Sequence, residues 1–231
     1  PMAMWKTAVA IVLLPVIAGT AGTAGTAAAQ ELLPPQPGLV VVYRHTANHG
    51  EAPPDNTFRV VAVDGLRSTA EVERATEPRE RYTLHSYRVW YSERIVQPRG
   101  TLHQDSPTGI LDEFALLKPG LVRVFPAKLR YEADPAQPVL PNGQLNRSTV
   151  SDLDMTYAVE RAERVGVPAG EFDTFVLART QVFGAGGTVA RRDVTRIWYA
   201  PELRWWVKIE TSSSAAGAPL ITGVAISIKR P

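Results

Sequence analysis

The C-terminal third of the chain is a series of short apolar segments separated by turn residues, and this pattern constrains the fold most strongly. Apolar and β-branched runs bounded by turn residues predict strands at 157–165, 172–182, 192–199, 204–210 and 220–229. In the last run large apolar residues alternate with small ones, as in a half-buried antiparallel strand. The large residues, which we expect to face the core, are Leu220, Val224, Ile226 and Ile228.

The same pattern extends toward the N-terminus. Residues 39–46 and 57–73 read as strands, and Asp64-Gly65 inside the second run is suited to a tight hairpin turn. Residues 81–97 predict one long strand with apolar side chains on both faces, as when a strand lies between two layers. Residues 133–146 contain three prolines and an Asn-Gly pair, which predicts a surface loop or a long connection.

One helix is expected. Residues 108–120 carry a helical stripe, end at Pro119-Gly120 and place Lys118 where it suits the helix dipole. The stripe consists of Ile110, Leu111, Phe114 and Leu117. The sequence therefore predicts a mostly β fold, a single antiparallel curved sheet or open or half barrel of roughly ten strands whose open face this short helix plugs.

The N-terminus has the order of a secretory signal peptide. Lys6 precedes eleven apolar residues at 8–18, and a small-residue stretch ends in an A-x-A site before Gln30. This predicts a signal peptide over 1–29, cleaved between Ala29 and Gln30, and a periplasmic or secreted protein. A membrane-spanning helix needs about 20 apolar residues, and this run is shorter and contains Pro15. Residues 30–37 follow as a proline-rich extended leader.

Composition excludes several classes of function. The chain has no cysteine, so disulfides, thiolate metal sites, cysteine nucleophiles and a lipid-modified cysteine are ruled out for this sequence. Residues 38–231 are expected to form a single β-rich domain, because a chain of this size can bury roughly 70% of its unfolded surface. After cleavage 24 basic and 23 acidic residues would remain, alternating in sign. Nucleic-acid binding needs a clustered basic face and is not expected.

Few residues are candidates for catalysis. Glu171 and Asp173 follow a Pro-Ala-Gly turn and would share one face of a strand. Two close carboxylates can serve as acid and base, but at the turn end of a strand solvent screens them, and a solvated pair is the favoured interpretation. The segment 183–188, FGAGGT, is followed by a strand-like run instead of the helix that a phosphate loop needs, so it predicts a hairpin turn.

The four histidines give no metal-binding spacing. They are His45, His49, His85 and His103. His45 and His49 are four residues apart, but they lie at a strand end, where helical spacing does not apply. No catalytic residue, metal site or cofactor is predicted. A deep pocket that holds His85 or His103 beside carboxylates would favour a hydrolase or metal enzyme with a dispersed site.

Aromatic residues are the best candidates for ligand binding. Three of the tryptophans fall within nine residues, and aromatic rings in a β-hairpin can line a ligand pocket or contact a partner. Core packing explains them equally well, although the alternation of side chains requires at least one tryptophan to leave the apolar face. The candidate ligand-binding residues are Trp90, Trp198, Tyr199, Trp205 and Trp206.

Three segments together resemble a known family. The pattern V-x-V-P-A-G-x-F-x-T-F at 165–175 is followed by W-Y-x-P-E-L at 198–203 and V-K-x-E at 207–210. These segments resemble exported bacterial proteins of domain of unknown function 3108. The resemblance implies a cell-envelope β-domain similar to lipocalin-like or lipoprotein-carrier folds, and it carries over no activity and no catalytic residues.

The leading hypothesis is a non-catalytic periplasmic domain that binds a lipid, another apolar ligand or an envelope component in the concave face of its sheet. The second is an interaction module with a solid core that contacts an envelope protein through Trp206 and its neighbours. The third is the enzyme with a dispersed site. The hypotheses differ in one observable feature, which is whether the β-domain encloses a cavity and what lines it.

Overall fold

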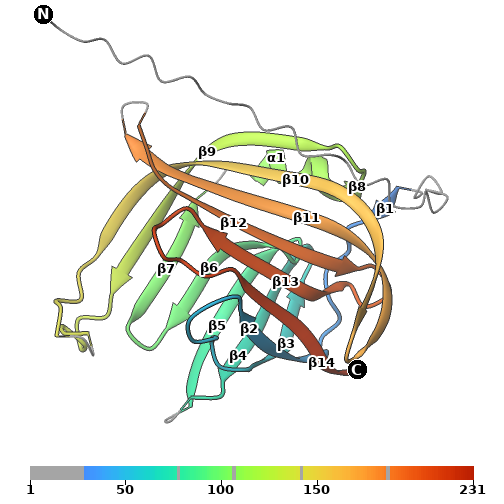
Figure 1. Cartoon of the computed structure of the whole chain (residues 1–231), viewed down its shortest axis with the longest axis horizontal. Coiled ribbons are helices and arrows are strands. Elements are labelled where there is room, and N and C mark those ends of the chain that lie inside the picture. Colours follow the sequence, from blue (N-terminus) through green and yellow to red (C-terminus); the bar gives the residue numbers. More distant parts are fainter. Residues whose placement is uncertain (1–28, 77–78, 106–107, 141–142, 186–187) are drawn as a thin grey trace, which may run out of the picture.

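The protein is described by a computed structural model that covers residues 29–76, 79–105, 108–140, 143–185 and 188–231. Apart from Ala29, the predicted signal peptide lies outside the described residues. The elements are mostly strands (Figure 1). They are β1 (Gln30–Glu31), β2 (Val40–Ala47), β3 (Asn56–Asp64), β4 (Arg67–Arg74), β5 (Glu80–Tyr87), β6 (Tyr91–Gln97), β7 (Gly100–Asp105), α1 (Thr108–Asp112), the 3-10 helix η1 (Glu113–Ala115), β8 (Leu116–Leu117), β9 (Val122–Ala133), β10 (Thr149–Val167), β11 (Gly170–Ala185), β12 (Thr188–Ala200), β13 (Trp205–Ser213) and β14 (Ile221–Lys229).

Within the described residues the long strands form one closed antiparallel barrel of twelve strands. Its order is β10-β11-β12-β13-β14-β2-β3-β4-β5-β6-β7-β9, and β9 pairs back onto β10. The prediction of a mostly β antiparallel chain with one short helix is confirmed. The prediction of an open or half barrel is wrong, because the twelve-residue β9 pairs with β7 on one side and β10 on the other. Such long-range pairing leaves no local signal in the sequence.

The register defines the inner face of the barrel. Leu177 of β11 lies opposite Ile197 of β12, which lies opposite Ile209 of β13. These three side chains line the barrel interior. Neighbouring residues on a strand point to opposite faces, so the residues directly before and after each of the three on its own strand face outward. Between bulges, every second residue of these strands therefore faces the interior.

The predicted hairpins and connections are largely confirmed. β3 and β4 are joined at Gly65, which has a φ of 56°, and β10 and β11 are joined by Pro168 and Ala169. The FGAGGT segment joins β11 to β12, although its tip at 186–187 lies outside the described residues. The described part of the segment between β9 and β10, which contains most of the predicted loop, has turns and an isolated bridge from Val139 to Leu145.

The single long strand predicted at 81–97 is wrong. The chain reverses between β5 and β6 and pairs the two strands as a hairpin. Arg88 and Val89 at the reversal have φ values of 46° and 60°, a region that residues other than glycine rarely occupy. No turn residue marks this position, so propensity alone could not predict it.

The helix is shorter than predicted, although its apolar stripe is correct. Leu111, Phe114 and Leu117 are at most 1% exposed. The helical segment ends at Ala115 because Leu116 and Leu117 pair with Glu31 and Gln30 as the β1–β8 ladder. The leader thus occupies the position where the helix would have continued. No helix in the described part of the chain is both long and apolar enough to span a membrane.

The facing of the last strand is also corrected. On β14 the small residues Gly223 and Ala225 face inward and are buried, and Val224 between them faces outward. Ile228 lies beyond a bulge, opposite the buried Val41, and packs against the core as predicted. A Cβ atom on Gly223 would lie 2.8 Å from atoms of His45 and Ile209. Large side chains on the neighbouring strands fill the interior here, so only glycine fits at position 223.

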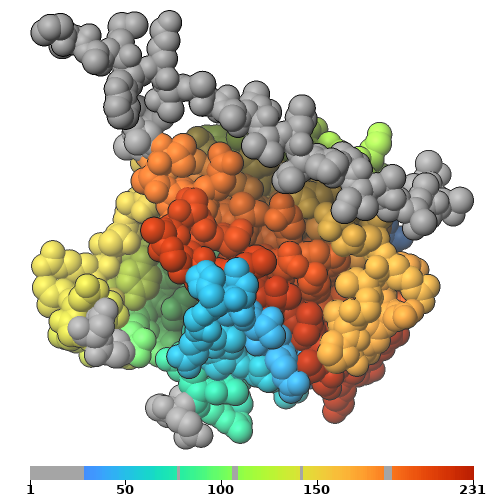
Figure 2. All heavy atoms as spheres, viewed as in Figure 1, coloured from blue at the N-terminus to red at the C-terminus, as the bar shows by residue number. Residues whose placement is uncertain are grey.

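Two connections contact β14 or the residue just before it. The segment after β2 lies beside the start of β14, where Asn48 and Leu220 exchange two hydrogen bonds (Figure 2). The β10–β11 hairpin curves along the barrel so far that the Ala169 N–H donates to the Ala225 carbonyl at 3.1 Å. β12 and β13 separate these strands in the barrel order, so the hairpin tip bridges across them.

Candidate functional site

The barrel interior contains two groups of aromatic rings. The first, called the Trp90 cluster, comprises Trp90, Tyr91, Phe114, Phe125 and Tyr157. The second, called the Trp206 cluster, comprises Tyr43, Phe58, Trp205 and Trp206. Neighbouring rings in each cluster have centroids 3.9 to 6.3 Å apart, a range in which aromatic pairs add favourable contacts to simple burial.

A cavity of about 170 Å³ touches both clusters. Trp90 contributes from the first cluster, and Phe58 and Trp206 contribute from the second. Between them the wall consists mainly of aliphatic side chains. These are Leu84, Val89, Ile95, Leu177, Ile197 and Ile209. The cavity is therefore an apolar compartment inside the barrel, and we call it the apolar compartment below.

A second cavity of about 150 Å³ adjoins the first and shares the walls Ser92, Ile95 and Arg179. Its remaining lining is more polar. It includes Gln104, Gln181, Arg191 and Asp193. We call it the polar compartment. The charges of Arg191 and Asp193 offset each other, since their side chains form an ion pair at 3.0 Å.

Arg179 lies at the boundary of the two compartments with few partners of its own. Its guanidinium donates to the Thr195 hydroxyl at 3.4 Å. Its Nε–H is buried and has no hydrogen-bond partner among the described residues. A buried donor without a partner costs about 1–3 kcal/mol, so this group needs an explanation.

Two other buried donors at these walls are also without a partner among the described residues. They are Nε1 of Trp90, in the apolar compartment, and Nε2 of Gln104, in the polar one. The Tyr157 hydroxyl approaches Gln104 and Arg179, but not in hydrogen-bonding geometry. Burial raises the pKa of Tyr157, and the nearby Arg179 only partly offsets this effect. The tyrosine is therefore protonated at neutral pH and can donate a hydrogen bond as well.

The β5–β6 turn builds one wall of the apolar compartment. Arg88, Val89 and Trp90 are at most 8% exposed, so this turn folds into the barrel. The Arg88 guanidinium donates to Asp112 of α1 at 3.1 Å, and the Trp90 ring lies 5.4 Å from that of Phe114. Backbone strain of this kind persists only where the surroundings enforce it and is found at functional sites.

The structure separates the five predicted ligand-binding residues. Trp90 and Trp206 line the apolar compartment. Trp205 is stacked on Trp206 at 3.9 Å and is 1% exposed. The Tyr199 hydroxyl donates to the Leu33 carbonyl at 3.3 Å, so it holds the leader. A ligand-binding role for these residues stays a prediction, and the geometry favours two of the five.

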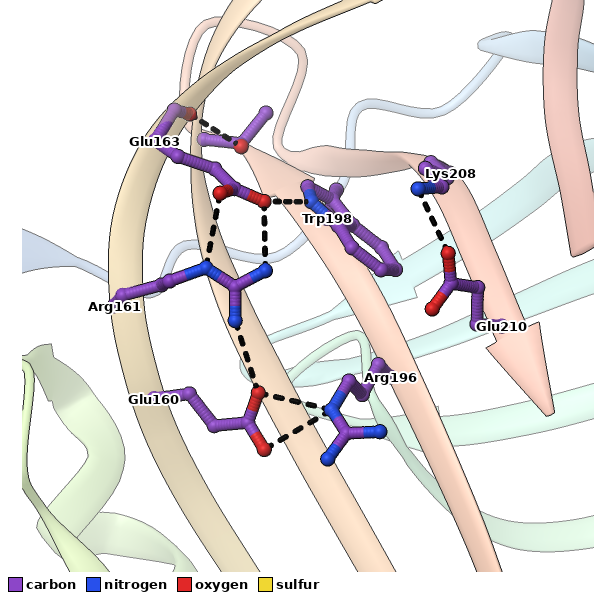
Figure 3. A network of polar contacts seen from close by, with 8 residues as sticks. Glu160, Arg161, Glu163, Arg196, Trp198, Lys208 and Glu210 are labelled. Carbon is purple, nitrogen blue, oxygen red and sulfur yellow. Dashed lines mark hydrogen bonds and ion pairs between the residues drawn. The ribbon is translucent and has the colours of Figure 1, made fainter. Parts of the chain in front are cut away.

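Trp198 lies on the outer face, because its neighbour Ile197 points inward (Figure 3). Its ring packs against the Lys208 ammonium at 4.1 Å, and its N–H donates to Glu163. The Arg161 guanidinium and, less strongly, this N–H lower the pKa of Glu163. Trp198 thus anchors a network of charges across β10, β12 and β13, which fits the expectation that one tryptophan leaves the inner apolar face.

Two of the histidines lie in an outer depression of about 440 Å³. His85 and His103 share it with Asp64 and Glu93. The Arg94 guanidinium lies 3.0 Å from His85 Nε2, and since arginine can only donate, Nε2 must be the acceptor. Nδ1 then carries the proton toward the Thr69 hydroxyl at 3.2 Å. Both ring nitrogens are engaged, so His85 in this geometry cannot take a proton from Thr69.

The carboxylates considered for catalysis are paired with arginines or exposed to solvent. Arg67 binds Glu93 through two nitrogens, and Arg164 pairs with Glu171 at 2.8 Å. Glu171 and Asp173 are exposed at the hairpin tip, as the solvated interpretation predicts. Among the described residues no group of three or more histidine, aspartate or glutamate side chains is arranged to hold a metal ion.

Arg179 is not among the predicted ligand-binding residues. A signal existed, because Arg179 follows Phe175 and Leu177 at intervals of two and so shares their face of the strand. An arginine in register with core residues is informative, since buried polar groups are rarer than exposed apolar ones. Ser92, which lines both compartments, could not be assigned to the inner face, because the prediction of one long strand at 81–97 missed the reversal at Arg88.

The chain thus forms a closed antiparallel barrel with an interior cavity, and a known structure shares this fold. The hypothetical lipoprotein YmcC from Escherichia coli (K12) has 10% sequence identity and a TM-score of 0.50 over 85% of this chain and 86% of its own. A protein of Bacteroides fragilis, provisionally described as an exported protein with a YmcC-like fold, has 13% identity and a TM-score of 0.43. That match covers 87% of this chain and 100% of the other.

No family model matches the chain, and no curated protein matches it. The resemblance to domain of unknown function 3108 therefore stays a prediction. At 10% identity the likeness to YmcC shows a shared fold, so any function must be argued from the residues of this chain.

Proposed function

We propose that this chain is a non-catalytic barrel of the bacterial cell envelope that holds a small apolar ligand in its interior. The observation that carries the proposal is the apolar compartment between the two aromatic clusters. Ligand sites are typically concave and mostly apolar, with a few polar groups that fix orientation. The apolar compartment with its polar neighbour fits this description.

The volume limits the size of the ligand. A cavity of about 170 Å³ holds roughly six methylene-sized groups, if each occupies roughly the 30 Å³ share of a water molecule in the liquid. Apolar cavities of about 150 Å³ stay dry and bind small hydrocarbons. A single short alkyl chain or one ring fits, whereas a diacyl lipid would require the barrel to open.

The proposed location rests on the sequence and on the shared fold. The order of charge, apolar run and A-x-A site at 1–29 supports export. YmcC, which shares the fold, is described as a hypothetical lipoprotein. This chain has no cysteine, so a periplasmic position would not depend on a cysteine-linked lipid.

Two features count against the other hypotheses. Trp206 is 6% exposed, so a partner could reach it only after the barrel had opened. The His85 ring uses both nitrogens in contacts with Thr69 and Arg94, which leaves it no role as a general base. Ligand binding inside the barrel requires neither exposure of Trp206 to a partner nor a free nitrogen on His85.

Native mass spectrometry of the full chain purified from the periplasm tests the proposal, combined with solvent extraction of any bound molecule. We expect an added mass that Ile209→Phe removes, because a larger ring fills the apolar compartment. Val224→Phe is the matched control, since Val224 faces away from the compartment opposite Lys208. A folded protein that carries no ligand and takes up none from added short-chain alcohols would refute the proposal.

A further inference from the structure

Three buried side-chain donors on residues of the cavity walls lack a partner among the described residues. They are Trp90 Nε1, Gln104 Nε2 and Arg179 Nε. The Tyr157 hydroxyl approaches two of them, has no partner in hydrogen-bonding geometry among the described residues, and can donate as well as accept. A ligand that satisfies these groups must bring acceptors.

The balance of charge selects an anion. Arg191 and Asp193 pair with each other at 3.0 Å, and the Ser213 hydroxyl donates to Asp193 at 2.6 Å. Arg179 contacts the neutral Thr195 and forms no ion pair with a described residue. The walls therefore carry one uncompensated positive charge, which matches a monoanion better than a dianion.

The position of Arg179 sets the orientation of the ligand. Arg179 belongs to both compartments, and on its apolar side the wall continues through Leu177, Ile197 and Ile209 to Trp206. An anionic head held at Arg179 would direct its tail into this aliphatic region. Guanidinium groups bind carboxylates through two parallel hydrogen bonds, so a carboxylate is the head that this geometry suits.

We propose that the interior site binds a single-chain carboxylate, with its head at Arg179 and Gln104 and an alkyl tail of roughly six carbons in the apolar compartment. This inference rests on the proposed function, because it assigns a chemical class to the ligand of the same site. Head and tail together correspond to a medium-chain fatty acid.

Binding of three probes to the full chain tests the inference. Octanoate, octanol and octylammonium are single chains of the same total carbon number that differ in the charge of the head. We expect octanoate to bind roughly tenfold to a hundredfold more tightly than octanol, the range for hydrogen bonds to a charged group, and octylammonium to be rejected. Isothermal titration and quenching of tryptophan fluorescence, to which Trp90 and Trp206 contribute, report the affinities.

Variants assign the preference to one residue. Arg179→Gln should lower octanoate affinity to that of octanol, whereas Arg179→Lys, which keeps the charge, should retain a preference for octanoate. Arg196→Gln is the matched control, because Arg196 lies on the outer face of β12 in an ion pair with Glu160 (Figure 3). A melting curve for each variant verifies that the barrel is folded.

The outcomes separate the two proposals. Equal affinity of octanoate and octanol for the natural sequence would overturn the carboxylate inference while supporting an apolar site. An octanoate preference that persists in Arg179→Gln would overturn the assigned residue and with it the inference. Failure of all three probes to bind the folded barrel would overturn both proposals.

Discussion

Two hairpin turns of the barrel differ in almost every respect. The β10–β11 turn at Pro168-Ala169-Gly170 is at the surface and consists of residues that favour turns. The β5–β6 turn at Arg88-Val89 is buried and contains neither glycine nor proline. In the first turn the positive φ falls on Gly170, and in the second it falls on an arginine and a β-branched valine.

The difference shows which part of the fold is locally determined. At the exposed turn the chain reverses where its own residues prefer to reverse. At the buried turn it reverses where the surroundings require it, because Arg88 pairs with Asp112 and the Arg88 N–H donates to the Leu66 carbonyl. The strained turn is also the one that builds a wall of the apolar compartment.

The largest expected effect comes from removing the anchor of the buried turn. Trp90→Ala should destabilise the protein by about 3–5 kcal/mol, the usual cost of truncating a buried aromatic residue to alanine, because it removes contacts with Phe114 and Tyr157. Denaturant unfolding measures the change. Val165→Ala in the exposed hairpin, where Val165 is half-buried, should cost about 1 kcal/mol. Similar losses at both sites would show that the buried turn is not specially held.

The exposed turn is tested at its glycine. Gly170 has a φ of 142°, so Gly170→Ala should cost about 1–3 kcal/mol of backbone strain. Space is not the limit, since the nearest atoms to an added Cβ are those of the Phe172 ring at 3.4 Å. Thermal unfolding reports the loss. Gly166→Ala is the control, because its φ is not in the positive range and no atom lies within 4 Å of an added Cβ. An equal effect of the two changes would remove the role assigned to Gly170.

The features that the residues determine locally could be predicted from the sequence. The antiparallel strands of the C-terminal third, the Asp64-Gly65 hairpin and the buried stripe of the helical segment follow from alternation, turn residues and helical spacing. Closure of the barrel by β9 and the reversal at Arg88 depend on contacts between distant segments. The inward facing of Gly223 has the same origin, because it is set by Ile209 and His45 on neighbouring strands.

The candidate site was predicted in part for the same reason. Trp90 and Trp206 were noted because aromatic residues are conspicuous, and both line the apolar compartment. Trp198 and Tyr199 were equally conspicuous and serve the outer face and the leader. Arg179 was missed because its importance comes from what it lacks, a carboxylate partner, and a sequence does not show which charges are paired.

The smallest expected effect tests the strain itself. Val89→Gly removes a side chain that is 1% exposed and so loses about 1.5–3 kcal/mol of burial. It also places glycine at a φ of 60°, which relieves about 1–3 kcal/mol of strain. The two terms nearly cancel, so the free energy of unfolding should change by about 1 kcal/mol or less.

Val72→Gly separates these two terms. Val72 is also 1% exposed, but it lies in β4 with a φ outside the positive range. This change loses the burial, gains no relief and adds the cost of a glycine within a strand. It should therefore destabilise the barrel by about 1–3 kcal/mol more than Val89→Gly, as chemical denaturation can measure. Equal losses of unfolding free energy would mean that Val89 stores no strain. The contrast between the buried β5–β6 turn and the exposed β10–β11 turn would then rest on Arg88 and Trp90 alone.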